Sequence, residues 1–396
     1  MKSLEKQGMT QQGIKALHFK QIYLHCLHSD GISRAQLRRS MGLSFPSVSA
    51  LVDELIDREI LEETGIVTGS SRGRPSTLLQ VKADRFVIPV VQLDHDSYHC
   101  KVFDFAAREL SNRFIPYGFE EHTVPIRNGR RCPSIEAMAD PLTQYIMESK
   151  KKAEPLALII STPGSVSASG AFSSSSIRIA SPDGFLSYLE SATGLDIFVG
   201  NTSDHYAYAE YHSSQIQEDF ALLLIGHGVG ASIVRHGRLF DAKPLRAGEI
   251  GHISIDYRGR PCLCGGCGCL ERYVSADAFA EDAGMDYSEL CECVLAGDEG
   301  AIAFIQQKAD LLAVGISNML TMQPVKQIVL GGQIRQLGEP FLTALQNSVK
   351  RIGFRKQMND IALRYSAEMD DPEILGALWN YIENQMKMDS LLDTVI

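Results

Sequence analysis

The sequence contains no segment with the character of an export signal or a membrane span. Its first residues, MKSLEKQGMTQQG, lack the apolar core that a secretory signal requires. Apolar runs are short, and one of the longest, 221–225, suits a buried strand. Repeats of solenoid length are also missing. These absences exclude exported, membrane-spanning and solenoid classes, and we expect a cytoplasmic protein.

The chain as a whole also lacks the positive charge typical of nucleic-acid-binding proteins, because its net charge is −10. The charge is unevenly distributed. Residues 1–82 hold eleven Lys and Arg against eight Asp and Glu, a balance of +3, which leaves −13 for residues 83–396. A modestly basic N-terminal part on an acidic body is typical of a DNA-reading module attached to a sensor.

At 396 residues the chain exceeds one ordinary domain. From about residue 85 short apolar runs alternate with helical segments, and the runs end at Gly, Ser or Asn, which indicates an α/β fold with ligand loops at strand ends. We predict one domain over 1–82 and a second over 83–396. The expected strands are 87–93, 100–105, 156–160, 197–199, 221–225 and 328–330, and the clearest helices are 135–149 and 301–322.

The first eighty residues have the pattern of a helix-turn-helix. An amphipathic helix around 17–27 is followed by a second helix that a Ser33–Gln36 capping box opens and Gly42 closes. Ser44 then caps a third helix with Pro46 in its first turn, and its apolar positions from Val48 to Ile56 fall on one face. Two helices joined by a short Met-Gly-Leu turn predict DNA binding. The alternative is a generic three-helix packing module.

Residues 60–64 and 77–81 can pair as the strands of a wing around a GSSRGRPS tip. Two arginines on such a thin arm can enter an A·T-rich minor groove, where the potential is most negative. The predicted DNA contacts are the polar residues of the third helix, the arginines that precede it and the wing arginines: Ser44, Ser47, Ser49, Arg38, Arg39, Arg72 and Arg74.

A cluster of cysteines stands out between residues 248 and 271, in GEIGHISIDYRGRPCLCGGCGCLE. His252, Cys262, Cys264 and Cys269 supply one imidazole and three thiolates, the ligand set of a structural tetrahedral zinc site. Cys267 could replace Cys269 without changing the ligand set. The alternative is a turn of reduced cysteines without a metal.

This segment resembles the signature of the ROK family, bacterial repressors and sugar kinases on the actin-like ATPase fold. Gly251-His252, the Cys262–Cys269 run and Glu271 match the family pattern, and 329–332 (VLGG) resembles its C-terminal nucleotide loop. The resemblance covers essentially the whole chain and, with the winged head, points to the repressor branch. It implies a two-lobed, ribonuclease H-like sensor domain and a structural Zn²⁺.

The resemblance also implies a sugar site. In sugar-binding members the residues matching Glu249, His252 and Glu271 bond sugar hydroxyls, and a Pro-Gly loop like that at Gly164 lies beside the pocket. Asn201 occupies a retained position of the family's catalytic motif. These five residues are the predicted ligand contacts.

The family's catalytic features are altered. The expected N-terminal phosphate loop, Asp-x-Gly-Gly-Thr, is replaced by Asp94-His95-Asp96-Ser97, whose carboxylates would repel ATP. Thr202 replaces the aspartate that acts as general base, and a threonine cannot take a proton at neutral pH. Asp204 is expected to point elsewhere. In the second glycine loop, His227 replaces the usual threonine. We expect no catalytic residues and no kinase activity.

The sequence therefore predicts a repressor of carbohydrate-metabolism genes that binds operator DNA and senses a sugar or sugar derivative. A homodimer or a tetramer would place two recognition helices on a pseudo-palindromic site. Two alternatives remain open at this point: an ATP-dependent sugar kinase, and a regulator whose input is a partner protein.

Overall fold

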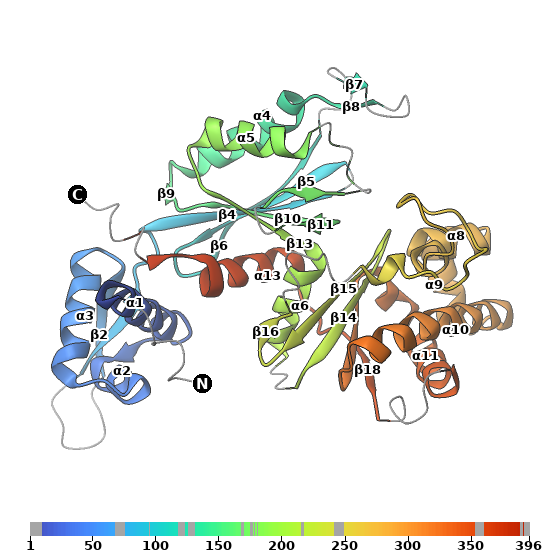
Figure 1. Ribbon diagram of the computed structural model, residues 1–396. Helices are drawn as coiled ribbons and strands as arrows, with labels where there is room; N and C mark the ends of the chain where they lie inside the picture. The colour runs from blue at the N-terminus through green and yellow to red at the C-terminus, as the bar shows by residue number, and fades with distance from the viewer. Residues whose placement is uncertain are drawn as a thin grey trace.

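The computed structural model describes residues 10–67, 76–94, 96–117, 123–125, 131–167, 170–174, 177, 179, 181–214, 218–240, 249–352, 360–388 and 391. The chain forms a small N-terminal head and two α/β lobes (Figure 1). In the described residues no helix has both the length and the apolar character that a membrane crossing requires.

The head is a winged helix-turn-helix, as the capping signals predicted. Ser33 and Gln36 form the capping box, Gly42 ends α2 in the left-handed region with φ 67°, and the Ser44 hydroxyl accepts the Ser47 N–H at the start of α3. The wing strands pair as predicted, and the short β1 adds a third strand on the other side of β3. The elements are α1 (Gln11–Leu27), β1 (Ile32–Ser33), α2 (Arg34–Met41), α3 (Phe45–Asp57), β2 (Leu61–Val67) and β3 (Ser76–Val81).

The first lobe is built on a mixed sheet with the strand order β13-β10-β4-β5-β6. Alternate residues of β4 face opposite cores, since Val87 and Val91 pack towards α4 and α5 whereas Ile88 and Val90 pack towards α13. The elements are β4 (Phe86–Leu93), β5 (Ser97–Asp104), β6 (Glu109–Pro116), β7 (Thr123–Pro125), β8 (Arg131–Pro133), α4 (Ile135–Ser149), β9 (Glu154–Pro155), β10 (Leu158–Thr162), β11 (Ser165–Val166), β12 (Phe172–Ser173), α5 (Pro182–Thr193) and β13 (Ile197–Asn201).

The second lobe has the strand order β16-β15-β14-β17-β18, and helices including α10 and α11 cover it. Its elements are β14 (Phe220–Ile225), β15 (Val229–Arg235), β16 (Arg238–Leu239), η2 (Ile250–His252), α7 (Glu271–Val274), α8 (Ala276–Ala283), α9 (Tyr287–Ala296), α10 (Glu299–Met322), β17 (Gln327–Gly331), η3 (Gln333–Leu337), α11 (Gly338–Ile352) and β18 (Ala362–Tyr365). Sequence and structure agree on every predicted strand and helix, with end shifts of a few residues; β10, for example, covers 158–162 instead of 156–160.

Two helices connect the parts of the molecule. The first, α6 (Thr202–Ser213), follows β13, and the second, α13 (Pro372–Asn380), continues into the π-helical turn η4 (Tyr381–Gln385). They cross so closely that a Cβ atom on Gly376 would lie 1.6 Å from the carbonyl oxygen of His205. The two helices are therefore in direct backbone contact with each other.

The head rests on the first lobe through α1. The Tyr23 hydroxyl donates to the carbonyl of Phe105 at 2.8 Å, and Lys20 donates to the carbonyl of Met386 at 2.9 Å. Apolar residues of the head share one continuous core with β4, β5 and α13. The head is therefore packed onto the first lobe and is not merely tethered to it.

A polar cluster joins the head to the far end of α6. The Glu383 carboxylate lies 3.0 Å from Nε2 of His212 and 3.4 Å from Nε2 of His28, at the end of α1, while Trp379 stacks against both imidazoles. Burial raises the pKa of Glu383, but hydrogen bonds from His212, His28 and Tyr208 outweigh it and hold this pKa well below the usual range. The carboxylate is ionised, so it binds α1 to α6 as a charged acceptor.

Candidate functional site

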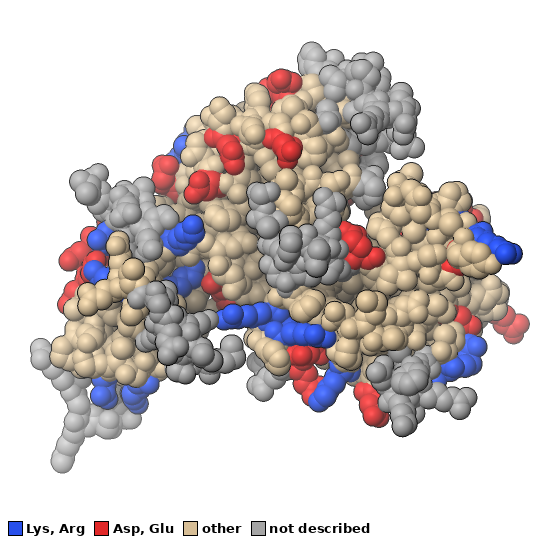
Figure 2. Space-filling view, viewed as in Figure 1, with Lys and Arg blue, Asp and Glu red and all other residues tan. Residues whose placement is uncertain are grey.

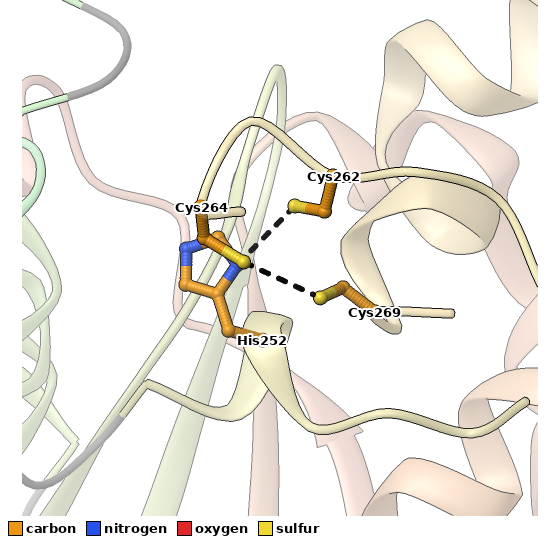
Figure 3. A group of neighbouring side chains, drawn as sticks. All are labelled: His252, Cys262, Cys264 and Cys269. Atoms are coloured by element: carbon orange, nitrogen blue, oxygen red, sulfur yellow. Dashed lines mark hydrogen bonds between the residues drawn. The ribbon is translucent and has the colours of Figure 1, made fainter. Parts of the chain in front are cut away.

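The structure brings together the four predicted metal ligands. His252 ends the short helix η2, and Cys262, Cys264 and Cys269 lie on the loop that leads into α7 (Figure 3). Two glycines let this loop close on itself: Gly265 has φ +92°, and Gly268 has φ +68° with a Cβ position only 1.6 Å from the carbonyl oxygen of Asp256.

The spacing of the ligand atoms fits a tetrahedral ion. All four ligand atoms lie within 4.8 Å of one another. The Cys264 and Cys269 sulfurs are 3.6 Å apart, as are the Cys262 sulfur and the His252 Nδ1 atom. A tetrahedron with metal–sulfur bonds of about 2.3 Å has sulfur–sulfur edges of roughly 3.8 Å. The cluster can therefore hold a metal ion with little rearrangement.

The thiols of the cluster differ in acidity. The N–H of Gly266 holds the pKa of Cys264 below its ordinary value, whereas burial raises the pKa of Cys269 to about 12. A divalent cation reverses such a rise because it favours the thiolate. Cys267 lies outside the group, and its thiol donates to the carbonyl of Tyr257 at 3.1 Å.

All five predicted ligand contacts line one cleft between the two lobes. The first lobe contributes Gly164, from the turn after β10, and Asn201, from the end of β13. The second lobe contributes Glu249, just before η2, His252, the last residue of η2, and Glu271, at the start of α7. The cleft lies beyond the carboxyl ends of the parallel strands β4, β10 and β13, where ligands of such sheets bind.

Two of these residues are held in place by hydrogen bonds. Glu271 accepts the N–H of Val229 at 3.0 Å through one carboxylate oxygen. The Asn201 side chain caps α6 by accepting the N–H of Ser203 at 2.7 Å, and its amide nitrogen donates to the carbonyl of Gly164. Asn201 thus fixes the Pro-Gly loop against the first turn of α6.

His252 connects the metal cluster to the cleft. Its Nδ1 atom faces the Cys262 sulfur, and its side chain also lines the cleft. One ring nitrogen can ligate a metal while the other remains available to a ligand. The cluster and the cleft therefore share a side chain.

The residues at or near the family's catalytic positions, Thr202 and Asp204, differ in burial and in hydrogen bonding. Thr202 is buried and its hydroxyl accepts the Ser161 hydroxyl at 3.5 Å. The prediction that Asp204 points elsewhere is wrong, because Asp204 lines the cleft and accepts the Ser232 hydroxyl at 2.7 Å. The reason is that α6 begins at Thr202, so its first turn presents Asp204 to the cleft. His95 lies outside the described residues.

Carboxylates outnumber arginines around the cleft, a property that only the folded chain reveals. Glu373, at the start of α13, had no sequence motif to mark it. Burial, with the nearby carboxylates of Asp371 and Asp94, raises its pKa to about 7 although its own N–H lowers it. The lining carboxylates are Asp94, Asp96, Asp204, Glu249, Glu271, Asp277, Glu373 and Glu383, and the lining arginines are Arg238 and Arg272.

Most of the predicted DNA contacts lie on the exposed end of the head. Arg38 and Arg39 are exposed in the last turn of α2, and Ser44 and Ser47 are exposed at the start of α3, whereas Ser49 is half-buried. Lys and Arg side chains gather at the lower edge of the head over α2 (Figure 2). Arg72 and Arg74 lie outside the described residues. Sequence reasoning did not single out Phe45, the first residue of α3, which is exposed.

Comparison with known proteins identifies a ROK family domain and, over nearly the whole chain, similarity to transcription regulators. The ROK family model matches residues 129–383. The DNA-binding transcriptional dual regulator NagC of Escherichia coli K12 is 24% identical over 384 residues, covering 92% of each chain. A xylose repressor of Caldicellulosiruptor bescii is 25% identical over 388 residues, covering 90% of this chain and 92% of the relative.

Kinases match a smaller part of the chain. An N-acetylmannosamine kinase of Citrobacter koseri is 30% identical over 195 residues, which are 48% of this chain and 66% of the kinase. Among solved structures, a ROK family transcriptional regulator homologous to E. coli Mlc superposes with a TM-score of 0.79 at 22% identity, covering 96% of this chain and 99% of the other. The predicted fold, a winged helix-turn-helix on a two-lobed sensor, is confirmed.

Proposed function

Because the chain belongs to the ROK family, we propose that it is a transcriptional regulator, acting as a repressor of carbohydrate-metabolism genes. Residues 1–82 bind operator DNA, and residues 83–396 sense a sugar or sugar derivative. The observation that carries this proposal is a winged helix-turn-helix whose core is continuous with a sugar-kinase-like fold. The full-length similarity to NagC and to a xylose repressor supports it.

In this proposal the DNA contacts are Arg38, Arg39, Ser44, Ser47, Ser49, Arg72 and Arg74. Changing Arg38 and Arg39 together to Ala is expected to weaken operator binding and to reduce the slope of log K against log salt by about 1 for each phosphate that is no longer neutralised. The measurement is fluorescence anisotropy at several salt concentrations on duplexes selected from a random library.

Lys326→Ala is the matched control for this charge removal, since Lys326 is an exposed cation of the second lobe that pairs with Glu218 at 3.2 Å. Its operator affinity and salt slope should equal those of the unaltered protein. An unchanged slope in the Arg38/Arg39 variant would remove these arginines from the interface.

The effector site comprises Gly164, Asn201, Glu249, His252 and Glu271, and the metal is a structural Zn²⁺ held by His252, Cys262, Cys264 and Cys269. Zinc fixes the loop that presents His252 and Glu271 to the cleft. Carboxylates accept sugar hydroxyls and satisfy them when they leave water. The many carboxylates of the cleft favour an uncharged sugar over its phosphate ester, because like charges repel strongly in a partly desolvated site.

Calorimetric titration of the zinc-loaded protein with sugars, amino sugars and sugar phosphates tests this site. We expect an uncharged sugar to bind at least about tenfold more tightly than its phosphate, and Glu271→Gln to weaken that binding by about tenfold or more. Glu292→Gln, a change at an exposed carboxylate of α9, is the control and should bind normally. Preference for the phosphate ester would contradict the electrostatic argument.

We also propose that the chain is not a kinase. The buried Thr202 hydroxyl and the two carboxylates at the former phosphate loop support this. Asp204 is the one nearby carboxylate of α6 that lines the cleft, so an assay of ADP release over the same sugar panel, with Asp204→Asn alongside, is the direct test. Turnover that disappears in Asp204→Asn would establish a kinase.

The regulator acts as a homodimer or a tetramer on a pseudo-palindromic operator in the cytoplasm. Two-fold symmetry would place two copies of α3 in successive major grooves. Sedimentation of the protein with and without selected DNA measures the number of chains per site, and a single chain per operator would contradict this arrangement.

A further inference from the structure

The first turn of α3 presents an apolar surface where a recognition helix meets DNA. Phe45 opens the helix and is 51% exposed, and its neighbours Pro46 and Ser47 are also exposed. Residues at the start of a recognition helix are those that contact base edges in a helix-turn-helix. A large aromatic side chain in this position is therefore available to a base.

The polar groups around Phe45 are engaged within the head. The Ser44 and Ser47 hydroxyls are hydrogen-bonded to each other at 2.7 Å, and the Ser44 oxygen also accepts the Ser47 N–H at 3.2 Å. Arg34, the cation at the start of α2, is held by Asp53 at 2.6 Å and Glu63 at 2.9 Å. Base reading by hydrogen bonds from this end of the helix is therefore restricted.

The helix itself carries no cation. From Phe45 to Asp57 it contains neither Lys nor Arg, and its charged residues are Asp53, Glu54 and Asp57. A helix without arginine or lysine cannot form the bidentate contact to guanine that is the commonest specific contact in the major groove. The large exposed side chain in its first turn is the phenyl ring of Phe45.

We propose that Phe45 recognises the 5-methyl group of a thymine in the major groove of the operator. The thymine methyl is the apolar mark of an A·T pair on that side of the duplex, and aromatic and other apolar side chains read it by contact. This inference rests on the proposed DNA-binding function and adds a specificity-determining residue to it. The resulting operator has a thymine that Phe45 covers in each half-site.

The experiment uses the full-length protein and duplexes selected from a random library. Each thymine of the selected site is replaced in turn by deoxyuridine, which pairs identically but lacks the methyl group. We expect one position per half-site at which this replacement weakens binding of the unaltered protein about fourfold, and about fifteenfold when both half-sites are replaced. Phe45→Ala should bind the thymine duplex more weakly and show no additional weakening with deoxyuridine at that position.

Phe114→Ala provides the matched control, because Phe114 is an exposed phenylalanine of β6 in the first lobe. It should retain both the affinity and the deoxyuridine effect of the unaltered protein. Insensitivity of the unaltered protein to every replacement, or the same penalty in Phe45→Ala, would overturn the role of Phe45 while leaving DNA binding established. Failure to select any site would instead reject the DNA-binding function itself.

Discussion

Removal of zinc by a strong chelator is expected to abolish effector binding in the cleft and to lower the Tm by on the order of 10 °C. Two large apolar side chains of the loop from His252 to Cys269, Tyr257 and Leu263, are 74% and 76% exposed, so they add little hydrophobic stabilisation to the loop. Structural zinc sites of this ligand set contribute folding free energy directly. Once the loop loosens, His252 and Glu271 lose their fixed positions.

Release of zinc measured with a colorimetric indicator, calorimetry with the effector and thermal unfolding together test this prediction. Two serine variants give a matched comparison within the loop. Cys262→Ser should lose the metal and effector binding, whereas Cys267→Ser should retain both because its thiol lies outside the cluster. Undiminished effector binding by fully chelated protein would show that zinc does not shape the site.

Gly376→Ala is expected to destabilise the protein by about 3 kcal/mol or more, because it forces α6 and α13 apart. The added methyl group would lie 1.6 Å from the carbonyl oxygen of His205 and 3.0 Å from the backbone nitrogen of Ala209. Both atoms belong to the backbone, so no side-chain rotation can relieve the overlap. The corresponding fall in Tm is roughly 5 °C.

Gly300→Ala is the matched control, because it makes the same Gly-to-Ala change in a helix without a clash against another helix's backbone. Gly300 lies in the first turn of α10, and its added Cβ would approach just one atom within 4 Å, the Asp298 Oδ1, at 3.2 Å. Its Tm should remain within about 1 °C of that of the unaltered protein. A Gly376→Ala variant as stable as this control, measured by circular dichroism, would show that the helix pair can separate without cost.

Local signals in the sequence predicted the head with good accuracy. Ser33, Gln36, Gly42 and Ser44 act through groups no more than four residues away, so the ends of α2 and α3 follow from neighbouring residues. The cysteine spacing likewise predicted the members of the metal cluster. The pairing of β1 with β3 could not be predicted in this way, because it consists of two residue pairs whose members are 45 or more positions apart in the sequence.

The cleft was predicted less completely than the metal cluster. Glu249, His252 and Glu271 were identified by their family pattern, whereas Glu373 reaches the cleft only because α13 packs across β4 and α6. The position of Asp204 on the cleft was also missed, because it depends on how the first turn of α6 packs against Ser232 of β15. Such placements depend on tertiary packing, which short-range patterns do not encode.

Helix α6 runs from the cleft to the contact with the head, so its length determines how far a tilt moves its C-terminal end. Its first turn is capped by Asn201 in the cleft, and His212, in its last turn, meets the head through Glu383. Twelve residues at 1.5 Å each make a rod of about 18 Å. A tilt of about five degrees at the first turn would displace the His212 end by about 1.5 Å; under the proposed function, α6 is therefore the lever arm through which closing of the lobes around a sugar would shift the head.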